Sequence, residues 1–176
     1  MSSKARILVY VLRRDLRLAD NPVFHEASKL FQQSQHPFTH FLPVYTFPAN
    51  QVEVSGFLSS SSQKSPYPEA RGETSGFWRC GKLRAKFLAE SVWDLKKDLE
   101  RIKSGLQIRV GTVHDAVRSI LEDYKGQSDS VEIAGVWMTN EEGVEEKREE
   151  RDVRKLCEEY DTKFKLWVDE KYYVDE

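Results

Sequence analysis

The stretch Ile7–Leu12, ILVYVL, is followed without a break by Arg13–Pro22, RRDLRLADNP. An apolar run without polar alternation indicates a strand that is covered on both faces. Asn21 can cap a following helix with its side chain, and Pro22 suits the first helical turn, where a missing N–H group has no cost. The junction therefore predicts a buried strand that ends in a turn and enters a helix.

The charged residues of this turn allow two interpretations. In the first, Arg13, Arg14 and Arg17 form ion pairs with Asp15 and Asp20 and make a salt-bridged turn. In the second, the arginines bind an anion, because open α/β sheets bind their ligands at the carboxyl ends of the strands. Physical chemistry alone favours the salt-bridged turn, because such loops are common.

The rest of the chain alternates between two kinds of pattern. Four further segments are short, apolar and rich in β-branched or aromatic residues, as strands are: 38–47, 106–110, 131–138 and 163–168. The segments around them have helical spacing: 21–33, 82–103, 113–124 and 141–160. This order predicts an α/β fold, a Rossmann-like parallel sheet with helices on both faces, joined by right-handed crossovers.

Composition restricts the class of protein. The chain has 176 residues, enough for one domain, and a formal net charge of −2, which lacks the basic excess that tight nucleic-acid binding by this segment would require. Cys80 and Cys157 lie far apart in the sequence, which favours a reducing intracellular compartment. The longest apolar run is too short for a membrane span, and no signal-peptide core is found at the start. We expect a soluble protein without membrane partners.

The segment of about 47–81 breaks the alternation. Its serine, proline and glycine content predicts a long surface loop within one domain, with a disordered middle at 59–65 and an ordered end at 76–81, GFWRCG. Phe77 and Trp78 in this end can anchor the loop to the core. They can equally form a stacking wall for a planar heterocycle.

The segment 139–155, TNEEGVEEKREERDVRK, is the most charged part of the chain. It is usually interpreted as a solvated helix face. Carboxylates on a first helical turn at the mouth of a sheet can instead accept hydrogen bonds from N–H groups of a ligand. No dinucleotide fingerprint, phosphate-binding loop, nucleophile elbow or metal-ligand spacing of histidines occurs, so we expect no catalytic residue and no metal.

Three motifs, in the same order along the chain as in a known family, indicate the class of protein more specifically. RRDLRLADNP after a strand resembles the opening of the photolyase and cryptochrome family. GFWRCGKLRAKFLAESVWDLKKDLERIKSGLQIRVG and KLWVDEKYYVDE are similar to the cryptochrome DASH branch, and the loop segments PVYTFPANQVEVSGFL and KSPYPEARGE are similar to its fungal members. The resemblance covers nearly the whole chain.

This resemblance implies a photolyase-type α/β domain over residues 1–176, with a five-stranded parallel sheet in the order 3-2-1-4-5. Family members also carry a larger helical domain that binds FAD and receives damaged DNA. We expect that domain to be absent from this chain, which would be either a fragment or a natural short form. The chain alone is then expected to bind no flavin and to repair no DNA.

The family's α/β domain commonly holds an antenna chromophore, the folate methenyltetrahydrofolate. The resemblance implies that Glu146 hydrogen-bonds the pterin ring, with Glu145 beside it and Glu141 as a lesser candidate. It also implies that Phe77, Trp78 and Cys80 border the pocket. Because the family's pocket uses side chains of the helical domain as well, we expect this chain alone to bind folate weakly or not at all.

The resemblance implies that the complete protein is a blue-light flavoprotein that acts as a photoreceptor, or repairs cyclobutane pyrimidine dimers in single-stranded DNA, or both. Its compartment, whether cytoplasm, nucleus or mitochondrion, stays open. One alternative is a stand-alone binding or regulatory module without photochemistry, which forms a homo-oligomer through the exposed interdomain face. Another is a nucleotide-using enzyme on a similar sheet, which the missing phosphate-binding loop disfavours.

Overall fold

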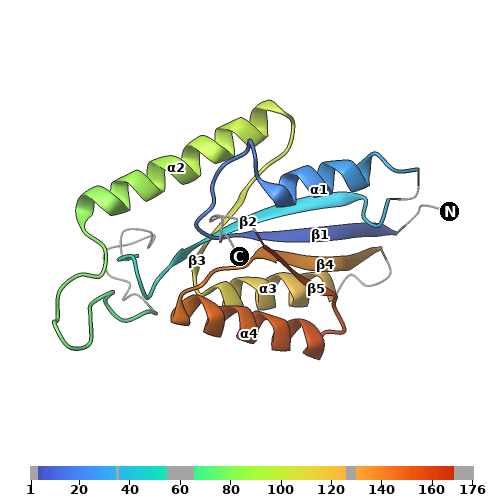
Figure 1. Cartoon of the computed structure of the whole chain (residues 1–176). Helices are drawn as coiled ribbons and strands as arrows, with labels where there is room; N and C mark the ends of the chain where they lie inside the picture. Colours follow the sequence, from blue (N-terminus) through green and yellow to red (C-terminus); the bar gives the residue numbers. More distant parts are fainter. Residues whose placement is uncertain (1–3, 35, 55–65, 126–129, 169–176) are drawn as a thin grey trace, which may run out of the picture.

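A parallel sheet between two layers of helices makes up the molecule (Figure 1). The computed structural model describes residues 4–34, 36–54, 66–125 and 130–168. The strands are β1 (Ala5–Leu12), β2 (His40–Pro48), β3 (Gln107–Gly111), β4 (Val131–Thr139) and β5 (Phe164–Trp167). The helices are α1 (Pro22–Phe31), α2 (Lys82–Arg101), α3 (Val113–Lys125) and α4 (Val144–Glu159). The strand order β3-β2-β1-β4-β5, with every pair parallel, confirms the predicted fold class and topology.

β1 is the central strand of the sheet. Its register places Val9 opposite Leu42 of β2 on one side and Val136 of β4 on the other. All residues from Ile7 to Leu12 are buried. The apolar run is continuous because successive side chains enter different cores on the two faces of the sheet.

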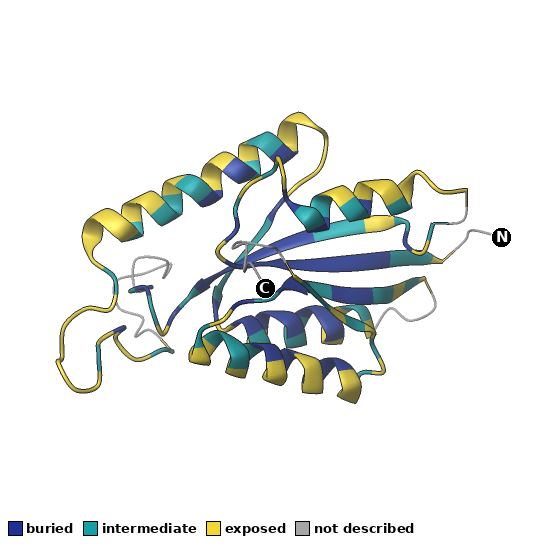
Figure 2. Cartoon of the chain, in the orientation of Figure 1, coloured by how far each residue is buried: buried dark blue, intermediate teal, exposed yellow. Residues whose placement is uncertain are grey.

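Hydrophobic cores on both faces of the sheet hold the layers together (Figure 2). Val9 and Val11 pack with side chains of α3 and α4, including Val117 and Val153. Tyr10 packs on the opposite face with side chains of α1 and α2. The ribbon shows the same division, with α1 and α2 above the sheet and α3 and α4 below it. Both faces of β1 are therefore covered, as its sequence predicts.

Several helix ends differ from the predicted boundaries, and two of these differences have a clear cause in the backbone. The sequence predicts a helix from residue 141, but α4 begins at Val144 because Gly143 before it has extended backbone angles, φ −70° and ψ 150°. α2 ends at Arg101 instead of Lys103, because Lys103 has a φ of 62°, which a right-handed helix does not allow. Glu141 consequently lies in the loop before α4.

The connection between β2 and α2 is the long surface loop that the composition predicts. Val52, Val54 and Ala70 of this loop are buried, so parts of it pack on the body of the protein. An antiparallel bridge between Arg71 and Trp78 closes its second half. The predicted ordered end at 76–81 is described, whereas the predicted disordered middle at 59–65 lies outside the described residues.

The start of α1 supports a first prediction on stability. The buried Asn21 side chain accepts hydrogen bonds from the N–H groups of Val23 and Phe24, at 3.0 and 3.1 Å, and donates one to the hydroxyl of Tyr10 at 3.1 Å. We expect Asn21→Ala to lower the free energy of unfolding by about 1–2 kcal/mol, measured by urea denaturation. Asn21→Ser should recover part of this loss, since serine can still cap the helix. An Asn21→Ala variant as stable as the wild type would contradict the prediction.

Candidate functional site

Arg13 connects the end of β1 to α4. Its side chain is 5% exposed, and its Nε lies 3.1 Å from a carboxylate oxygen of Glu149. Its Nη1 donates to Glu150 at 2.9 Å and to the carbonyl oxygen of Thr139, the last residue of β4, at 3.1 Å. A buried strand can therefore end in an arginine because carboxylates from the neighbouring βα unit neutralise it.

The other two arginines of the motif have different partners. Arg17 pairs with Asp15, with Nε 2.8 Å from Oδ1, whereas Arg14 pairs with Glu146 of α4. The salt-bridged turn predicted from the sequence is thus correct for Arg17 and wrong for Arg13 and Arg14. The reason is topological: β1 and β4 are parallel neighbours, so the loops that leave their carboxyl ends lie at one edge of the sheet.

The first turn of α4 presents two glutamates at this edge. Glu145 and Glu146 follow the N-cap Gly143, where the helix dipole favours negative charge. Arg79 of the long loop contacts the Glu145 carboxylate, with Nη2 2.6 and 2.9 Å from its two oxygens. A Cβ atom on Gly143 would overlap the carboxylate of Glu146, so glycine lets that side chain fold back over the start of the helix.

These side chains border a cavity of about 330 Å³ between the start of α4, the start of α2 and the long loop. Its lining combines carboxylates, arginines and apolar side chains: Arg14, Gln51, Val52, Arg79, Cys80, Arg84, Leu88, Val144, Glu145 and Glu146. Glu146 is the more enclosed of the two glutamates, with 12% of its side chain exposed against 49% for Glu145. The cavity lies where open α/β sheets bind ligands, beyond the carboxyl ends of the strands.

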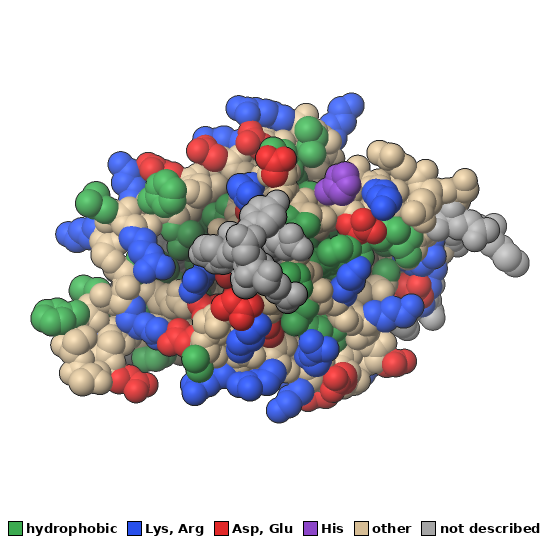
Figure 3. Space-filling view, viewed as in Figure 1, with side chains coloured by type: hydrophobic (Ala, Val, Ile, Leu, Met, Phe, Trp, Pro, Cys, Tyr) green, Lys and Arg blue, Asp and Glu red, His purple; other side chains and the backbone are tan. Residues whose placement is uncertain are grey.

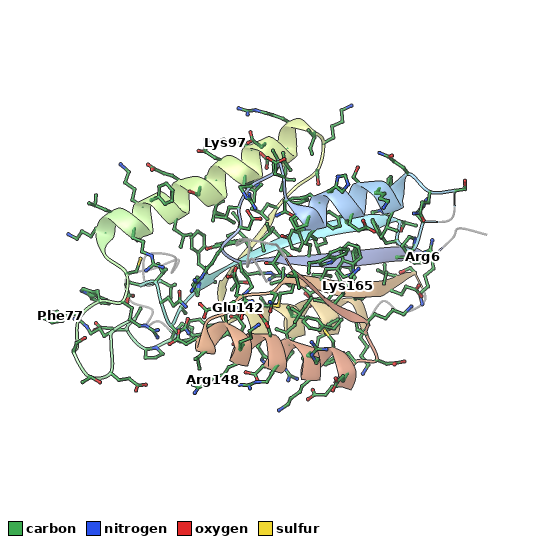
Figure 4. All side chains as sticks on the ribbon, in the orientation of Figure 1. Arg6, Phe77, Lys97, Glu142, Arg148 and Lys165 are labelled. Atoms are coloured by element: carbon green, nitrogen blue, oxygen red, sulfur yellow. The ribbon has the colours of Figure 1, made fainter. Side chains whose placement is uncertain are left out.

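The structure brings three of the six predicted site residues together, namely Glu145, Glu146 and Cys80. Phe77 is 77% exposed and projects away from the body of the protein (Figure 4). Trp78 lies under the guanidinium of Arg71, 3.8 Å from the ring centroid. Glu141 is buried, and its backbone N–H donates to Glu150 at 2.8 Å. These last three residues do not line the cavity.

Sequence reasoning missed most of the cationic and apolar lining. Arg79 lies within the GFWRCG segment, but only its neighbours Phe77, Trp78 and Cys80 were predicted to border the site. Arg84 and Leu88 are one helical turn apart on α2, so the i, i+4 spacing was available as a signal. Val52 lies in an irregular loop, where no periodicity marks its position.

A half-buried carboxyl group on α4, that of Glu149 beside Arg13, gives a pH-dependent prediction. Burial raises the pKa of Glu149 above 4.5, the nearby Arg13 lowers it, and Glu146 raises it. A raised pKa means that this carboxyl contributes stability below its unfolded-state pKa and loses that contribution as the pH rises through the folded-state value. We therefore expect Glu149→Gln to be more stable than the wild type at pH 7, with the difference vanishing in acid.

Urea denaturation at several pH values would measure this difference. Glu90→Gln on the exposed face of α2 is a suitable control, because its side chain is 62% exposed and should give a nearly constant difference. A Glu149→Gln variant that is less stable than the wild type at neutral pH would show that attraction to Arg13 exceeds the cost of burial.

A larger groove lies elsewhere, between α1 and the end of α2. It measures about 1350 Å³, and aromatic side chains of Phe24, Phe31, Phe38 and Phe41 contribute to its lining. None of the six predicted site residues borders it. We place the candidate site at the smaller cavity, because that cavity combines the enclosed carboxylate of Glu146 with apolar lining residues.

The surface offers little further indication of a partner. Lysine and arginine side chains are interspersed with acidic ones over the face shown in Figure 3. Within the described ranges, no three His, Cys, Asp or Glu side chains are placed to hold a metal ion. None of the helices described has both the length and the apolarity to cross a membrane. Cys80 and Cys157 are both free thiols, and burial raises the pKa of Cys157 to about 12.

Solved structures with the same architecture define the class of fold. A cryptochrome from Synechocystis sp. PCC6803 is similar with a TM-score of 0.71 and 20% identity, over 96% of this chain and 28% of that one. An archaeal photolyase from Sulfolobus tokodaii, solved with two FAD molecules, is similar with a TM-score of 0.60 and 18% identity, over 93% of this chain and 29% of that one. The fold is that of an α/β domain found in photolyases and cryptochromes.

The sequence comparisons give the family. The model of the DNA photolyase family matches residues 8–174, and the chain belongs to this family. A Neurospora crassa protein named as a mitochondrial cryptochrome DASH is 46% identical over 97% of the chain, and a cryptochrome DASH of Gibberella zeae is 45% identical over the same share. The chain spans 22% and 24% of the lengths of these two fungal relatives.

Proposed function

We propose that the chain is the antenna-binding domain of a cryptochrome DASH-type flavoprotein, and that the cavity at Glu146 holds the pterin ring of methenyltetrahydrofolate. One observation carries the proposal: an enclosed carboxylate on the first turn of α4 lines a partly apolar cavity at the carboxyl edge of a photolyase-type sheet. The Glu146 carboxylate suits a pterin, because a pterin presents ring N–H and amino donors and an ionised carboxylate accepts strong hydrogen bonds from such groups.

The lining residues fit such a group. Val52, Leu88 and Val144 supply apolar contact for a planar heterocycle, and Glu146 supplies the acceptor. A volume of about 330 Å³ lies at the lower end of the range for ligand pockets, so the cavity suits a ring while the rest of the ligand stays outside. When bound, the folate supplies light absorption and passes excitation to a flavin. The chain itself binds and orients this group and moves no proton.

The rest of the proposed function depends on residues outside this chain. Family resemblance supports a helical domain that carries FAD, completes the antenna pocket and receives damaged or single-stranded DNA. In that complete form, the protein would be a blue-light photoreceptor, a light-driven repair enzyme for cyclobutane pyrimidine dimers, or both. The chain alone is proposed to have neither flavin nor repair activity.

Titration with methenyltetrahydrofolate tests the proposal. We expect weak, saturable binding to the chain alone and tighter binding, with near-ultraviolet absorption that copurifies, in a longer form that carries the helical domain. FMN and FAD serve as competing ligands, because the archaeal photolyase was solved with two FAD molecules. Displacement of the folate by either flavin would assign the cavity to a flavin antenna. A longer form that binds neither class would refute the antenna role.

Exposed apolar side chains on α2 favour a second candidate function, a stand-alone binding or regulatory module. Leu83 is 86% exposed and Phe87 is 71% exposed on the same helix. Apolar residues of this size in one exposed stretch are a common mark of an interaction surface. Light scattering would test it: a dimer that Leu83→Ser and Phe87→Ser dissociate supports the module, and a monomer at high concentration opposes it.

A further inference from the structure

Gly143 lies at the N-cap of α4, and the backbone at this position does not require glycine. Its φ of −70° and ψ of 150° are extended angles that any residue adopts. What glycine provides here is space, because a Cβ atom would lie 2.9 Å from the carboxylate carbon of Glu146 and would overlap one of its oxygens. A larger residue at position 143 would therefore leave the backbone unstrained but would displace the carboxylate, which is the flexible end of its side chain.

The spacing of these two residues is that of an incomplete capping box. Glu146 is the third residue of α4, and a glutamate at this position can fold back over the N-cap. In a complete capping box the N-cap is serine or threonine, whose hydroxyl accepts a hydrogen bond from the third residue. Gly143 offers no such cap. The chain thus lacks a stabilising group at the position against which the Glu146 carboxylate lies, and a departure of this kind from local helix chemistry is typical of functional sites.

The N-cap of α2 provides a comparison, because it has the same residue in nearly the same conformation. Gly81 has a φ of −74° and a ψ of 159°, and it too offers no side-chain cap. A Cβ atom on Gly81 would have no atom within 4 Å among the described residues beyond its chain neighbours. The close approach at Gly143 is therefore not a general consequence of glycine at a helix start, and it depends on the placement of Glu146.

We propose that Gly143 is a positioning residue for the carboxylate that binds the ligand. Because position 143 has no Cβ atom, the Glu146 carboxylate can lie over the start of α4, where it lines the cavity and is available as an acceptor. Gly143 itself is not among the lining residues. The inference rests on the proposed function and deepens it, since it assigns the direction of the acceptor to a residue that does not line the cavity.

Alanine and serine at position 143 separate positioning from a structural role. Alanine adds only the Cβ atom that displaces the carboxylate. Serine adds the same atom and also completes the capping box, so it should stabilise the helix while it draws the carboxylate toward the N-cap. A purely structural role would make stability and ligand affinity change together, whereas positioning makes them change in opposite directions in Gly143→Ser.

Affinity for methenyltetrahydrofolate, measured on the form that carries the helical domain, is the first test. We expect Gly143→Ala and Gly143→Ser to weaken binding about five- to tenfold, as part of the loss of a hydrogen bond to a charged group. Gly143→Ser should also raise the midpoint of urea denaturation. The matched control Gly81→Ala should stay within about twofold of the wild type. In a Glu146→Ala background, where no carboxylate meets the added methyl group, Gly143→Ala should cause no further loss.

The ligand-free chain of 176 residues gives a second test that does not depend on folate. NMR of glutamate carboxyl carbons should show that Gly143→Ala shifts the Glu146 signal and that Gly81→Ala leaves it in place. If methenyltetrahydrofolate binds to no form but the Glu146 signal shifts in this way, the proposed function fails and the positioning of the carboxylate by Gly143 is supported. An unshifted signal, an unchanged affinity of Gly143→Ala, or an equal loss in the Glu146→Ala background would each overturn the inference.

Discussion

Replacing Arg13 with methionine is expected to lower the free energy of unfolding by about 3–5 kcal/mol, the usual cost of removing one partner from a buried ion pair. Glu149 and Glu150 would then lie side by side without the guanidinium that neutralises them. Methionine has a similar length and keeps most of the apolar contacts. The decrease in the free energy of unfolding therefore measures mainly the loss of the ion pairs. Urea denaturation followed by circular dichroism measures the change.

Two further variants separate the ion pair from packing. Arg101→Met on α2 removes an arginine that is 75% exposed and pairs with Asp98, so we expect a change below about 1 kcal/mol. The double variant Arg13→Met with Glu150→Gln should be more stable than Arg13→Met alone, because one of the two carboxylates that Arg13 neutralises is gone and only the longer contact of Glu150 with Lys147, at 3.8 Å, is lost with it. A double variant with no recovery would mean that Arg13 acts through packing and not through its charge.

The residue pattern was sufficient to predict the order of elements and a parallel sheet, whereas the strand order 3-2-1-4-5 came from the family resemblance. The continuous apolar run from Ile7 to Leu12 matches the burial of β1 on both faces. Asn21 and Pro22 start α1 as their local chemistry predicts, because capping depends on residues only a few positions apart. These sequence patterns are local or periodic, so the structures that they predict do not depend on contacts with distant parts of the chain.

The partners of the arginines could not be predicted in this way. Arg13 meets Glu150, 137 positions later, and Arg14 meets Glu146, 132 positions later. Nothing in a single sequence tells whether an arginine pairs with the nearby Asp15 or with a distant glutamate, since either partner satisfies the charge. Only the parallel pairing of β1 with β4 decides it.

In the candidate site, too, some residues could be placed from the sequence and others could not. Glu145 and Glu146 lie on the helix predicted after β4, but on its first turn instead of its second, because α4 begins at Val144 and not at residue 141. Phe77 and Trp78 were assigned to the wall of the site, but they lie in an irregular loop, where sequence gives no direction for a side chain. The Trp78 ring contacts the guanidinium of Arg71, its partner in the antiparallel bridge, and no periodicity in the sequence indicates this pairing.

The buried ion pair and the candidate cavity are parts of one arrangement. Arg13 bonds to the second turn of α4 through Glu149 and Glu150, and Glu146 lies one turn before Glu150 on the same helix. Side chains four residues apart share a face of a helix. The interactions that fix α4 to the end of β1 therefore also fix the direction of the Glu146 carboxylate, which helps preorganise the cavity for a ligand.

Substitution of Glu146 by glutamine is expected to weaken binding of methenyltetrahydrofolate about 10- to 100-fold, which corresponds to loss of a hydrogen bond to a charged group. Glutamine keeps the size of the side chain and one acceptor oxygen, but it lacks the negative charge that strengthens hydrogen bonds from a pterin. The affinity can be measured by equilibrium dialysis on the form that carries the helical domain, and by NMR on the chain alone.

Glu142→Gln is the matched control for this measurement. Glu142 lies close in sequence, its side chain is 83% exposed, and it is not part of the cavity lining, so its substitution should leave the affinity within about twofold. Glu146→Gln also frees Arg14 from its partner, which adds positive charge to the cavity and favours any anionic chain on the ligand. A pterin without such a chain should therefore lose more affinity than the complete folate does. Equal losses for the two ligands would mean that Arg14 does not contribute, and no loss for either would remove Glu146 from the proposed pterin contact.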